Sequence, residues 1–352
     1  MAKIDLRSLK KSTICDSLKG AKVIVYGGNN LGKTYQMSRF TDKVLLLATE
    51  SGYGAADCVI QEVTSWVQFK DIVKQLTSEK VDKDDKNGRL EWETMQDLYD
   101  TILIDTTENL VDLAEKQTCT EFGVRDLSEI EDSRKNGYSI YRKDFKATVD
   151  RLCHFGYTVV FVSHEEFIEK TDAKGNKYRY MQPKGSDNIK GSTRFVRDLC
   201  DFCIALVSNG VDEDGTPIPS SAYCAETKTL FARSRYAMVP FIEEFSAENL
   251  KAAMLDAMRK TAENRKAGIA PWTIKKEGYS ANELINMIKP YFTAARAKFP
   301  DDVDNIVETS LGKRVSEATD DDVVQLENVY NQLTTLCDNQ GIYSRESKES
   351  NA

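Results

Sequence analysis

The chain carries, close to its start, the stretch Val23-Ile24-Val25-Tyr26-Gly27-Gly28-Asn29-Asn30-Leu31-Gly32-Lys33-Thr34. Its first four residues are apolar and mostly β-branched, which predicts a buried strand, and the next eight fit the pattern Gly-x4-Gly-Lys-Thr. Glycines let the backbone wrap closely around a phosphate, and the N–H groups of the loop and of the following helix point toward the anion. The stretch therefore predicts a phosphate-binding loop between a strand and a helix that begins near Lys33.

The loop residues have distinct expected tasks. Lys33 should contact the β- and γ-phosphates of a nucleoside triphosphate, and Thr34 should place its hydroxyl on magnesium. The expected cofactors are therefore ATP and Mg2+. A glycine-rich turn with a coincidental Gly-Lys-Thr is the structural alternative, and the preceding strand argues against it. The predicted nucleotide-binding residues are Gly27, Gly28, Asn29, Asn30, Leu31, Gly32, Lys33 and Thr34.

A second apolar run, Thr101 to Ile104, ends in the carboxylate Asp105. An aspartate at a strand end is by itself only a common cap or turn residue. Magnesium, however, needs carboxylate support to hold its waters, and the phosphate-binding loop lies upstream. Thr34 and Asp105 are therefore the predicted metal residues.

Hydrolysis also needs a group that orients or deprotonates the attacking water. Glu50 ends the apolar run Val44 to Thr49 and is the first candidate, whereas Glu108, three residues past Asp105, competes for the same role. The run Tyr157 to Val162 ends in Ser163-His164, where His164 would contact the γ-phosphate. A surface or helix-capping Glu50, and a His164 that merely satisfies a loop, are the structural alternatives.

Short β-rich runs alternate with helical patterns through the first two hundred residues, which predicts an α/β fold with a mostly parallel, twisted sheet. The expected strands are Ala21 to Tyr26, Lys43 to Thr49, Thr101 to Asp105, Tyr157 to Ser163 and Phe202 to Val207. Residues Ala222 to Glu244 predict antiparallel strands that extend the sheet. From Ser246 onward the pattern becomes helical, with helix starts expected at Ser280 and Thr319.

Composition limits the class of protein. The 352 residues have a formal charge of −8, which argues against a protein that coats nucleic acid with its whole surface. No apolar run is long enough to cross a bilayer, and the start lacks a signal-peptide pattern. Eight cysteines lie scattered in apolar runs, as buried free thiols do. We therefore expect an intracellular protein without membrane partners.

These patterns predict four regions. Residues 1–20 form an N-terminal segment, 21–245 the nucleotide-binding core, 246–341 a small helical region, and 342–352 a flexible tail.

The order of motifs resembles a known family. A phosphate-loop strand, then strands ending in Thr49-Glu50, Asp105-Thr106 and Ser163-His164, is similar to the RecA-like ATPase core, and most of all to the phage RecA-like ATPases grouped with the Sak single-strand annealing proteins. The resemblance covers Ala21 to Phe245. It implies that Glu50 is the catalytic carboxylate and His164 the nucleotide sensor, in the cytoplasm of the host cell if the protein is phage-encoded. Thr106 after Asp105 resembles the RecA type more than the AAA+ type.

The segment Lys170 to Arg197 is locally basic, with eight Lys or Arg against two Asp, or about +6. Aromatic residues are interleaved, as single-stranded DNA binding requires, and Asp172 to Asn176 predicts a hairpin turn. The candidate nucleic-acid residues are Lys174, Lys177, Tyr178, Arg179 and Tyr180. Candidates for contact with the nucleotide of a neighbouring subunit are Lys184, Lys190 and Arg194. An ordinary solvated hairpin is the alternative.

Two functions of different class fit these observations. The first is an ATP-dependent, single-stranded DNA-binding protein of recombination or annealing that acts as a homo-oligomer with DNA-stimulated hydrolysis. The second is a nucleotide-switched adaptor such as a helicase loader, for which the helical C-terminal region would bind a replication protein or single-strand-binding protein.

Overall fold

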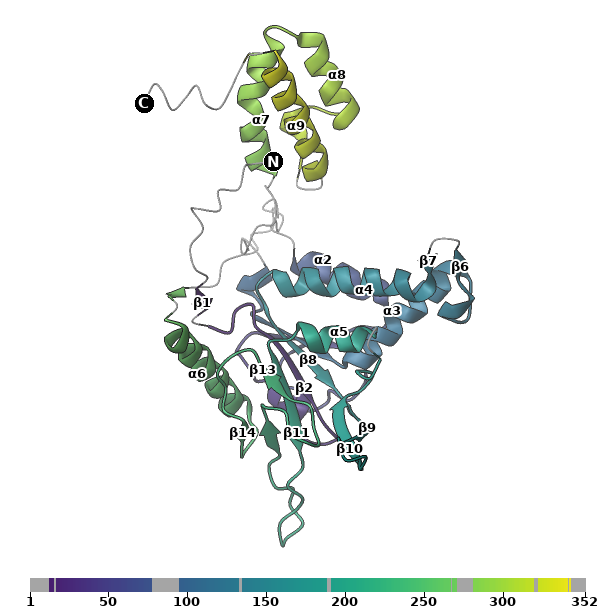
Figure 1. The fold of residues 1–352 in the computed structure, drawn as a ribbon, viewed down its shortest axis with the longest axis vertical. Helices are drawn as coiled ribbons and strands as arrows, with labels where there is room; N and C mark the ends of the chain where they lie inside the picture. Colours follow the sequence, from purple (N-terminus) through teal and green to yellow (C-terminus); the bar gives the residue numbers. More distant parts are fainter. Residues whose placement is uncertain are drawn as a thin grey trace, which may run out of the picture. The chain divides into compact units, whose positions relative to one another are not determined.

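Two units with separate hydrophobic cores divide the chain in the computed structural model (Figure 1). One comprises Lys10–Ile274, and the other comprises Met1–Leu9 together with Lys275–Ala352. Among the described residues, no helix has both the length and the apolar character needed to cross a membrane. The structure describes residues 13–15, 17–77, 95–132, 135–188, 191–266, 268–270, 281–319, 322–340 and 342.

A nine-stranded sheet forms the centre of the larger unit, and six neighbouring strands in it are parallel. All five strands expected from the sequence are confirmed. The sixth, β4, was missed because its four residues are all exposed and carry no apolar signal. In spatial order the parallel strands are β11 (Phe202–Val207), β2 (Lys22–Tyr26), β8 (Thr158–Ser163), β5 (Thr101–Asp105), β3 (Val44–Ala48) and β4 (Val59–Glu62).

Antiparallel strands extend the β11 side of the sheet, as the sequence predicted. β12 (Ser221–Tyr223) and β13 (Arg233–Ser234) both pair with β11, and β14 (Phe241–Ile242) pairs with β12. A separate hairpin of β9 (Glu165–Thr171) and β10 (Lys177–Pro183) follows β8 directly, with Gly175 at φ 83° in its turn. This hairpin confirms the predicted turn at Asp172 to Asn176.

Both faces of the sheet are covered, because successive strand residues point to opposite sides. Ile24 and Ile104 belong to one core cluster, whereas Val23 and Leu103 belong to the other. On the first face lie α2 (Trp66–Leu76), α3 (Thr107–Phe122), α4 (Gly137–His154) and α5 (Ser192–Leu199); on the second lie α1 (Lys33–Met37) and α6 (Ala247–Arg265). The shorter elements are β1 (Ile14–Cys15), β6 (Glu131–Asp132), β7 (Lys135–Asn136), β15 (Ile269–Ala270), η1 (Met95–Asp97) and η2 (Leu127–Glu129).

The structure moves the boundary between core and helical region. The sequence placed it at 246, but α6 buries Leu250, Met254 and Ala257 in the same cluster as β2, so the division falls after Ile274. Ile14 and Leu18 are buried there too, and β1 pairs with β15. Part of the expected N-terminal segment is therefore core, because apolar side chains in flanking segments cover the second face of the sheet.

The smaller unit is helical, as expected. It contains α7 (Ala281–Arg296), α8 (Pro300–Ser310), η3 (Val315–Glu317) and α9 (Val323–Asn339). Its core joins Leu284, Ile288, Val303, Leu326 and Leu333. The two helices expected after Ser280 and Thr319 are confirmed as α7 and α9, and α8 was missed. Of the expected flexible tail, all residues but 342 lie outside the described residues.

Candidate nucleotide-binding site

The register of the parallel strands brings the predicted residues to one edge of the sheet. Asp105 is level with Ala48 on β3 and with Val162 on β8, and Ser163 is level with Tyr26 on β2. The carboxyl ends of these strands therefore meet at the same edge, where open α/β sheets bind their ligands. The loop after Tyr26, Glu50 after β3 and His164 after β8 all begin there.

The loop after β2 has the backbone that a phosphate cradle needs. Gly27 has φ 155°, and a Cβ there would lie 2.7 Å from the carbonyl oxygen of Leu206. Gly32 has φ 79° and Asn30 has φ 61°, in the left-handed region. A side chain at Gly27 would clash and one at Gly32 would strain the backbone, whereas asparagine tolerates the left-handed region better than most residues. Asn29 and Asn30 are exposed, and the Leu31 carbonyl accepts a hydrogen bond of 2.9 Å from the Ser220 hydroxyl.

Lys33 is buried at the mouth of this loop, with 7% of its surface exposed. Its Nζ donates to the carbonyl oxygens of Gly27 at 3.0 Å and Gly28 at 2.6 Å. Burial lowers the pKa of Lys33, while the nearby carboxylates, Asp105 first, oppose that shift. Among the described residues no carboxylate lies within 4.0 Å of the Lys33 ammonium. The group is therefore positioned to hold an anion, since its present partners are neutral carbonyls.

Thr34 and Asp105 form the predicted pair. The Thr34 hydroxyl donates to Asp105 Oδ2 at 2.5 Å, and Asp105 is 4% exposed. Burial raises the pKa of Asp105, and the charge of Glu50 adds to that effect. A hydroxyl and a carboxylate side by side are hard oxygen donors of the kind that Mg2+ takes. The residues present thus fit Mg2+ and a triphosphate: a glycine cradle, one buried ammonium and one oxygen pair.

Glu50 is tied to this pair through Thr49. The Thr49 N–H donates to the Asp105 carbonyl at 2.8 Å, and the Thr49 hydroxyl accepts from the Thr106 N–H at 2.8 Å. Glu50 itself is half-buried and accepts a hydrogen bond of 3.2 Å from Asn109 Nδ2. Its carboxylate is close enough for its charge to act on Asp105, and Asn109 helps to orient it.

Glu108, the other candidate for the base, already contacts His164. Its Oε1 accepts from the backbone N–H of His164 at 2.9 Å and contacts His164 Nδ1 at 2.5 Å. Its Oε2 is buried without a partner among the described residues, and the side chain is 11% exposed. A carboxylate used to hold a histidine is poorly placed to take a proton from water. Glu108 therefore supports His164, and Glu50 is the less engaged of the two carboxylates.

Residues 19–236 match a protein family described as an AAA domain, 218 of the 352 residues. The chain belongs to this AAA-domain family. It is also similar to the SPbeta prophage-derived uncharacterized protein YorG of Bacillus subtilis (strain 168), with 31% identity over 323 residues, 89% of this chain and 91% of that protein. Family membership implies nucleotide binding and an ATPase. The match to this family and to a prophage-derived protein supports a phage-associated P-loop ATPase, and it does not single out the Sak group.

Two groups at the site of this AAA-domain core were missed from the sequence. Asn109 holds Glu50, and Glu165 approaches the loop so closely that a Cβ on Gly28 would lie 3.4 Å from Glu165 Oε1. The charge of Glu165 also acts on Lys33. Asn109 lies in the first turn of α3 and Glu165 directly follows His164. Both residues lie close to a strand end in the sequence, and this position is the signal that could have identified them.

The hairpin of the AAA-domain core is less basic than its local sequence suggested. Lys177 pairs with Glu169 at 2.7 Å, Arg179 lies 4.2 Å from the ring centre of Phe167, and Lys228 lies 5.5 Å from that of Tyr178. Lys174 is exposed in the turn. The expectation for Tyr180 needs correction: it is 3% exposed and its hydroxyl bonds to Glu226, so its ring is not presented to a base.

The candidates for contact with a neighbouring subunit are spread out. Lys184 has an exposed side chain, and its N–H donates to the His164 carbonyl at 2.9 Å, which puts it beside His164. Arg194 lies on α5, with Nε 3.6 Å from Asp198. Lys190 lies outside the described residues.

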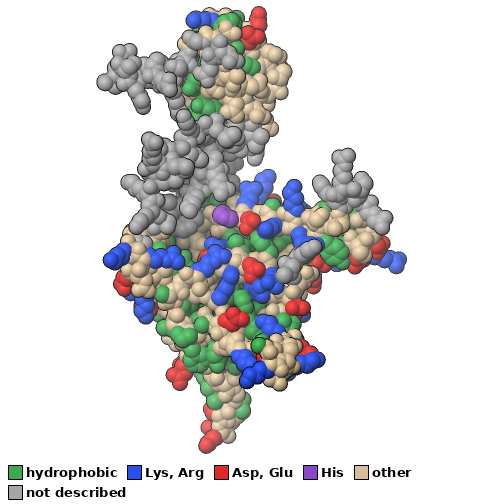
Figure 2. All heavy atoms as spheres, viewed as in Figure 1, with side chains coloured by type: hydrophobic (Ala, Val, Ile, Leu, Met, Phe, Trp, Pro, Cys, Tyr) green, Lys and Arg blue, Asp and Glu red, His purple; other side chains and the backbone are tan. Residues whose placement is uncertain are grey.

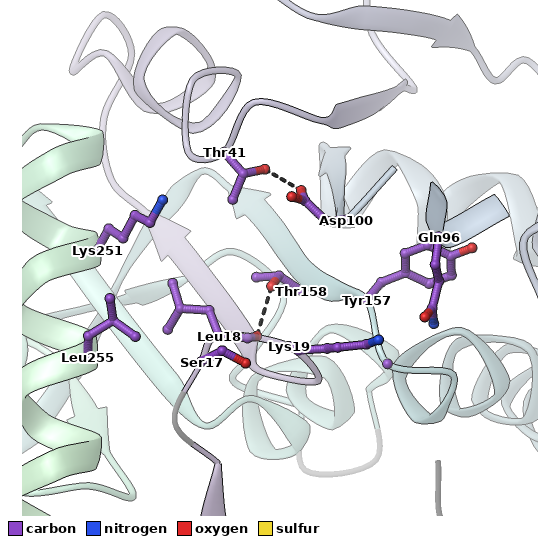
Figure 3. Close-up of a pocket in the computed structure, with 11 residues that line it drawn as sticks. Ser17, Leu18, Lys19, Thr41, Gln96, Asp100, Tyr157, Thr158, Lys251 and Leu255 are labelled. Atoms are coloured by element: carbon purple, nitrogen blue, oxygen red, sulfur yellow. Dashed lines mark hydrogen bonds between the residues drawn. The ribbon is translucent and has the colours of Figure 1, made fainter. Parts of the chain in front are cut away.

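A cavity of about 340 Å³ lies at the opposite edge of the sheet, near the start of β8 (Figure 3). Its polar groups largely satisfy each other: Thr41 donates to Asp100 at 2.5 Å, and Thr158 donates to the Leu18 carbonyl at 2.8 Å. Asp100 and Thr158 precede or begin their strands, whereas the loop with Lys33 follows the end of one. This cavity is therefore separate from the candidate nucleotide site.

Proposed function

We propose that this protein is an ATP-dependent, single-stranded DNA-binding protein of phage-type recombination or annealing, active as a homo-oligomer in the host cytoplasm. The observation that carries the ATPase part is the joining of Lys33, the Thr34–Asp105 pair and Glu50 at one sheet edge. The nucleic-acid part is supported by local basic character in a chain of charge −8, and by the prophage origin in the name of the similar YorG protein.

In this proposal each residue of the site has one task. The loop Gly27 to Gly32 and Lys33 hold the triphosphate, and Thr34 with Asp105 holds Mg2+. Bound ATP supplies the phosphoryl group, and Mg2+ neutralises its charge. Glu50 orients a water and accepts its proton, with Asn109 fixing the carboxylate.

His164 is the proposed sensor at the end of β8. Because Glu108 accepts from both its backbone N–H and its ring Nδ1, the opposite ring nitrogen, Nε2, is left to contact the nucleotide. Lys184 is the proposed contact with a neighbouring subunit's nucleotide. These roles resemble those of the Sak-group ATPases, and that likeness is part of the proposal.

The deciding experiment measures ATP hydrolysis with and without an oligothymidylate. We expect single-stranded DNA to raise turnover severalfold and to bind with an affinity that falls as salt rises, at a slope of about −0.7 per phosphate contact. Absence of both binding at low salt and stimulation would remove the nucleic-acid role and leave the ATPase role standing.

A second candidate is a nucleotide-switched adaptor, such as a helicase loader. It is favoured by the helical unit, which has its own core and begins after the last residue matched to the AAA domain. Capture of a replication or single-strand-binding protein in ATP but not in ADP, with no response to DNA, would favour this candidate over the first.

A further inference from the structure

A groove between α4 and α5 has three cations and one carboxylate among its seven lining residues. Its volume is about 410 Å³, within the roughly 300–1,000 Å³ range of ligand pockets. Arg142 and Lys146 come from α4, and Arg194 comes from α5. Figure 2 shows Lys and Arg side chains gathered on the face where these two helices lie. The remaining lining residues are Gly191, Ser192, Phe195 and Asp198.

The cations that line this groove outnumber the carboxylates in its lining. Asp198 is the single carboxylate in the lining, and it is shared by Arg194 at 3.6 Å and Arg197 at 2.9 Å. Neither Arg142 nor Lys146 has a described carboxylate within 4.0 Å; Glu115 and Asp150 act on them only from a greater distance. Two exposed or half-exposed cations are therefore left to attract an anion in a chain of net charge −8.

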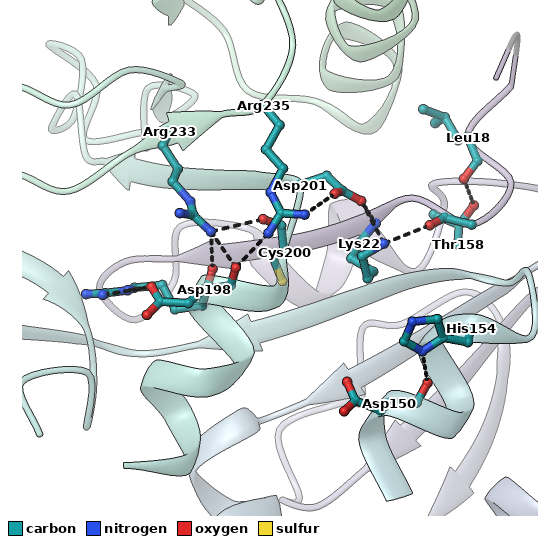
Figure 4. A network of polar contacts seen from close by, with 12 residues as sticks. Leu18, Lys22, Asp150, His154, Thr158, Asp198, Cys200, Asp201, Arg233 and Arg235 are labelled. Atoms are coloured by element: carbon teal, nitrogen blue, oxygen red, sulfur yellow. Dashed lines mark hydrogen bonds and ion pairs between the residues drawn. The ribbon is translucent and has the colours of Figure 1, made fainter. Parts of the chain in front are cut away.

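Other cations near α5 already have partners within the fold (Figure 4). Arg233 donates to the carbonyls of Asp198 at 2.7 Å and Cys200 at 3.3 Å, at the end of α5. Arg235 and Lys22 both pair with Asp201, at 3.1 and 3.0 Å. These groups cap a helix and join strands, so they are distinct from the cations of the groove.

The arrangement of the groove cations suits a chain of phosphates. Arg142 and Lys146 are four residues apart on α4, about one turn, so they present two charges in a row along the helix. Arg194 adds a third from the facing helix, where Gly191 and Ser192 begin α5. Phe195 lies beneath Lys146, with the ammonium 4.9 Å from its ring centre, and so forms a wall rather than a free stacking surface.

We propose that the α4–α5 groove binds the phosphodiester backbone of single-stranded DNA, through Arg142, Lys146 and Arg194. This inference rests on the proposed function and deepens it, because it moves the DNA contact away from the β9–β10 hairpin. There Glu165, Glu166, Glu169 and Asp172 equal the four basic residues of the strands and turn in number. It also assigns Arg194 to DNA binding in its own subunit, rather than to contact with the nucleotide of a neighbouring subunit.

The test uses the full-length protein and a fluorescent oligothymidylate, with anisotropy measured at several salt concentrations. For Arg142→Ala/Lys146→Ala we expect affinity to fall at least about tenfold and the salt slope to become shallower by about 1.4, two phosphate contacts. The matched control Lys174→Ala/Lys177→Ala removes two hairpin charges and should stay within about twofold of wild type. ATP hydrolysis without DNA should be unchanged in both.

A charge-conserving variant, Arg142→Lys/Lys146→Arg, separates charge from fold: it should keep the wild-type salt slope. Loss of affinity in the hairpin variant alone would overturn the groove and keep the proposed function. If the wild-type protein binds no DNA at low salt, the groove inference and the proposed DNA-binding function both fail. Displacement of DNA by micromolar inorganic phosphate, or by poly-glutamate as well as by unlabelled DNA, would assign the groove to a free anion or an acidic peptide and overturn the inference.

Discussion

The carboxyl edge of the sheet and the β9–β10 hairpin lie one residue apart in sequence, at His164 and Glu165, yet they use charge in opposite ways. At the edge, Lys33 is 7% exposed, and its ammonium donates to two carbonyl oxygens. On the hairpin, the Lys177 side chain is 69% exposed and pairs with Glu169 across the two strands. The contrast teaches that burial and the absence of a direct ion pair, rather than a local count of basic residues, mark a binding group.

The largest expected effect comes from replacing a cation on each side of this comparison. Lys33→Ala should weaken binding of a fluorescent ATP analogue by at least about a hundredfold, because a buried charged hydrogen-bond donor contributes about 3 kcal/mol. Lys174→Ala, in the exposed hairpin turn, should leave that affinity unchanged in the same titration. Equal losses in the two variants would break the comparison.

The next pair of variants distinguishes the roles of the two carboxylates at this edge, Glu50 and Glu108. Glu50→Gln should bind ATP within about threefold of wild type but hydrolyse it about 10²- to 10⁴-fold more slowly, as expected on loss of a general base. Glu108→Gln should hydrolyse ATP about tenfold more slowly, because Glu108 acts through His164. Steady-state phosphate release measures both. Normal turnover in Glu50→Gln would pass the catalytic role to Glu108.

The burial of Asp105 should also affect the thermal stability of the protein. Because burial raises the pKa of Asp105, ionisation destabilises the nucleotide-free fold as the pH rises above the ordinary pKa of aspartate, and the effect is complete above the raised pKa. Asp105→Asn should therefore raise the melting temperature by about 2–4 °C near pH 8, and the gain should shrink as the pH falls toward the ordinary pKa of aspartate. Asp57→Asn, an exposed carboxylate, is the matched control. A gain that grows on acidification would contradict the argument.

The smallest effect is expected within the hairpin. Tyr180→Phe removes a hydroxyl that bonds to the exposed Glu226, so it should lower the melting temperature by about 1–3 °C while leaving DNA affinity unchanged. Tyr178→Phe, at a half-buried ring, should change neither quantity. A loss of DNA affinity in Tyr180→Phe with intact stability would restore its role as a base-stacking residue.

The sequence by itself determined the strands of the sheet and the residues at their ends. Apolar runs such as Val23 to Tyr26 are buried on both faces, so their pattern was unambiguous, and the loop and Asp105 follow from what comes after them. The same reasoning missed β4, whose exposed residues carry no such pattern, and it placed α6 outside the core because an Ala-rich helix does not reveal what covers it.

Only the tertiary structure decided between groups that the sequence left equal. Glu50 and Glu108 look alike as residues after strands, but one is held by Asn109 and the other by His164. Lys177 of the hairpin and the α4–α5 cations look alike as charges, but Lys177 meets Glu169 of the paired strand, whereas Arg142 and Lys146 meet no carboxylate within ion-pair distance among the described residues. The physical reason is that a charge acts through its neighbours in space, and strand pairing and helix packing choose those neighbours.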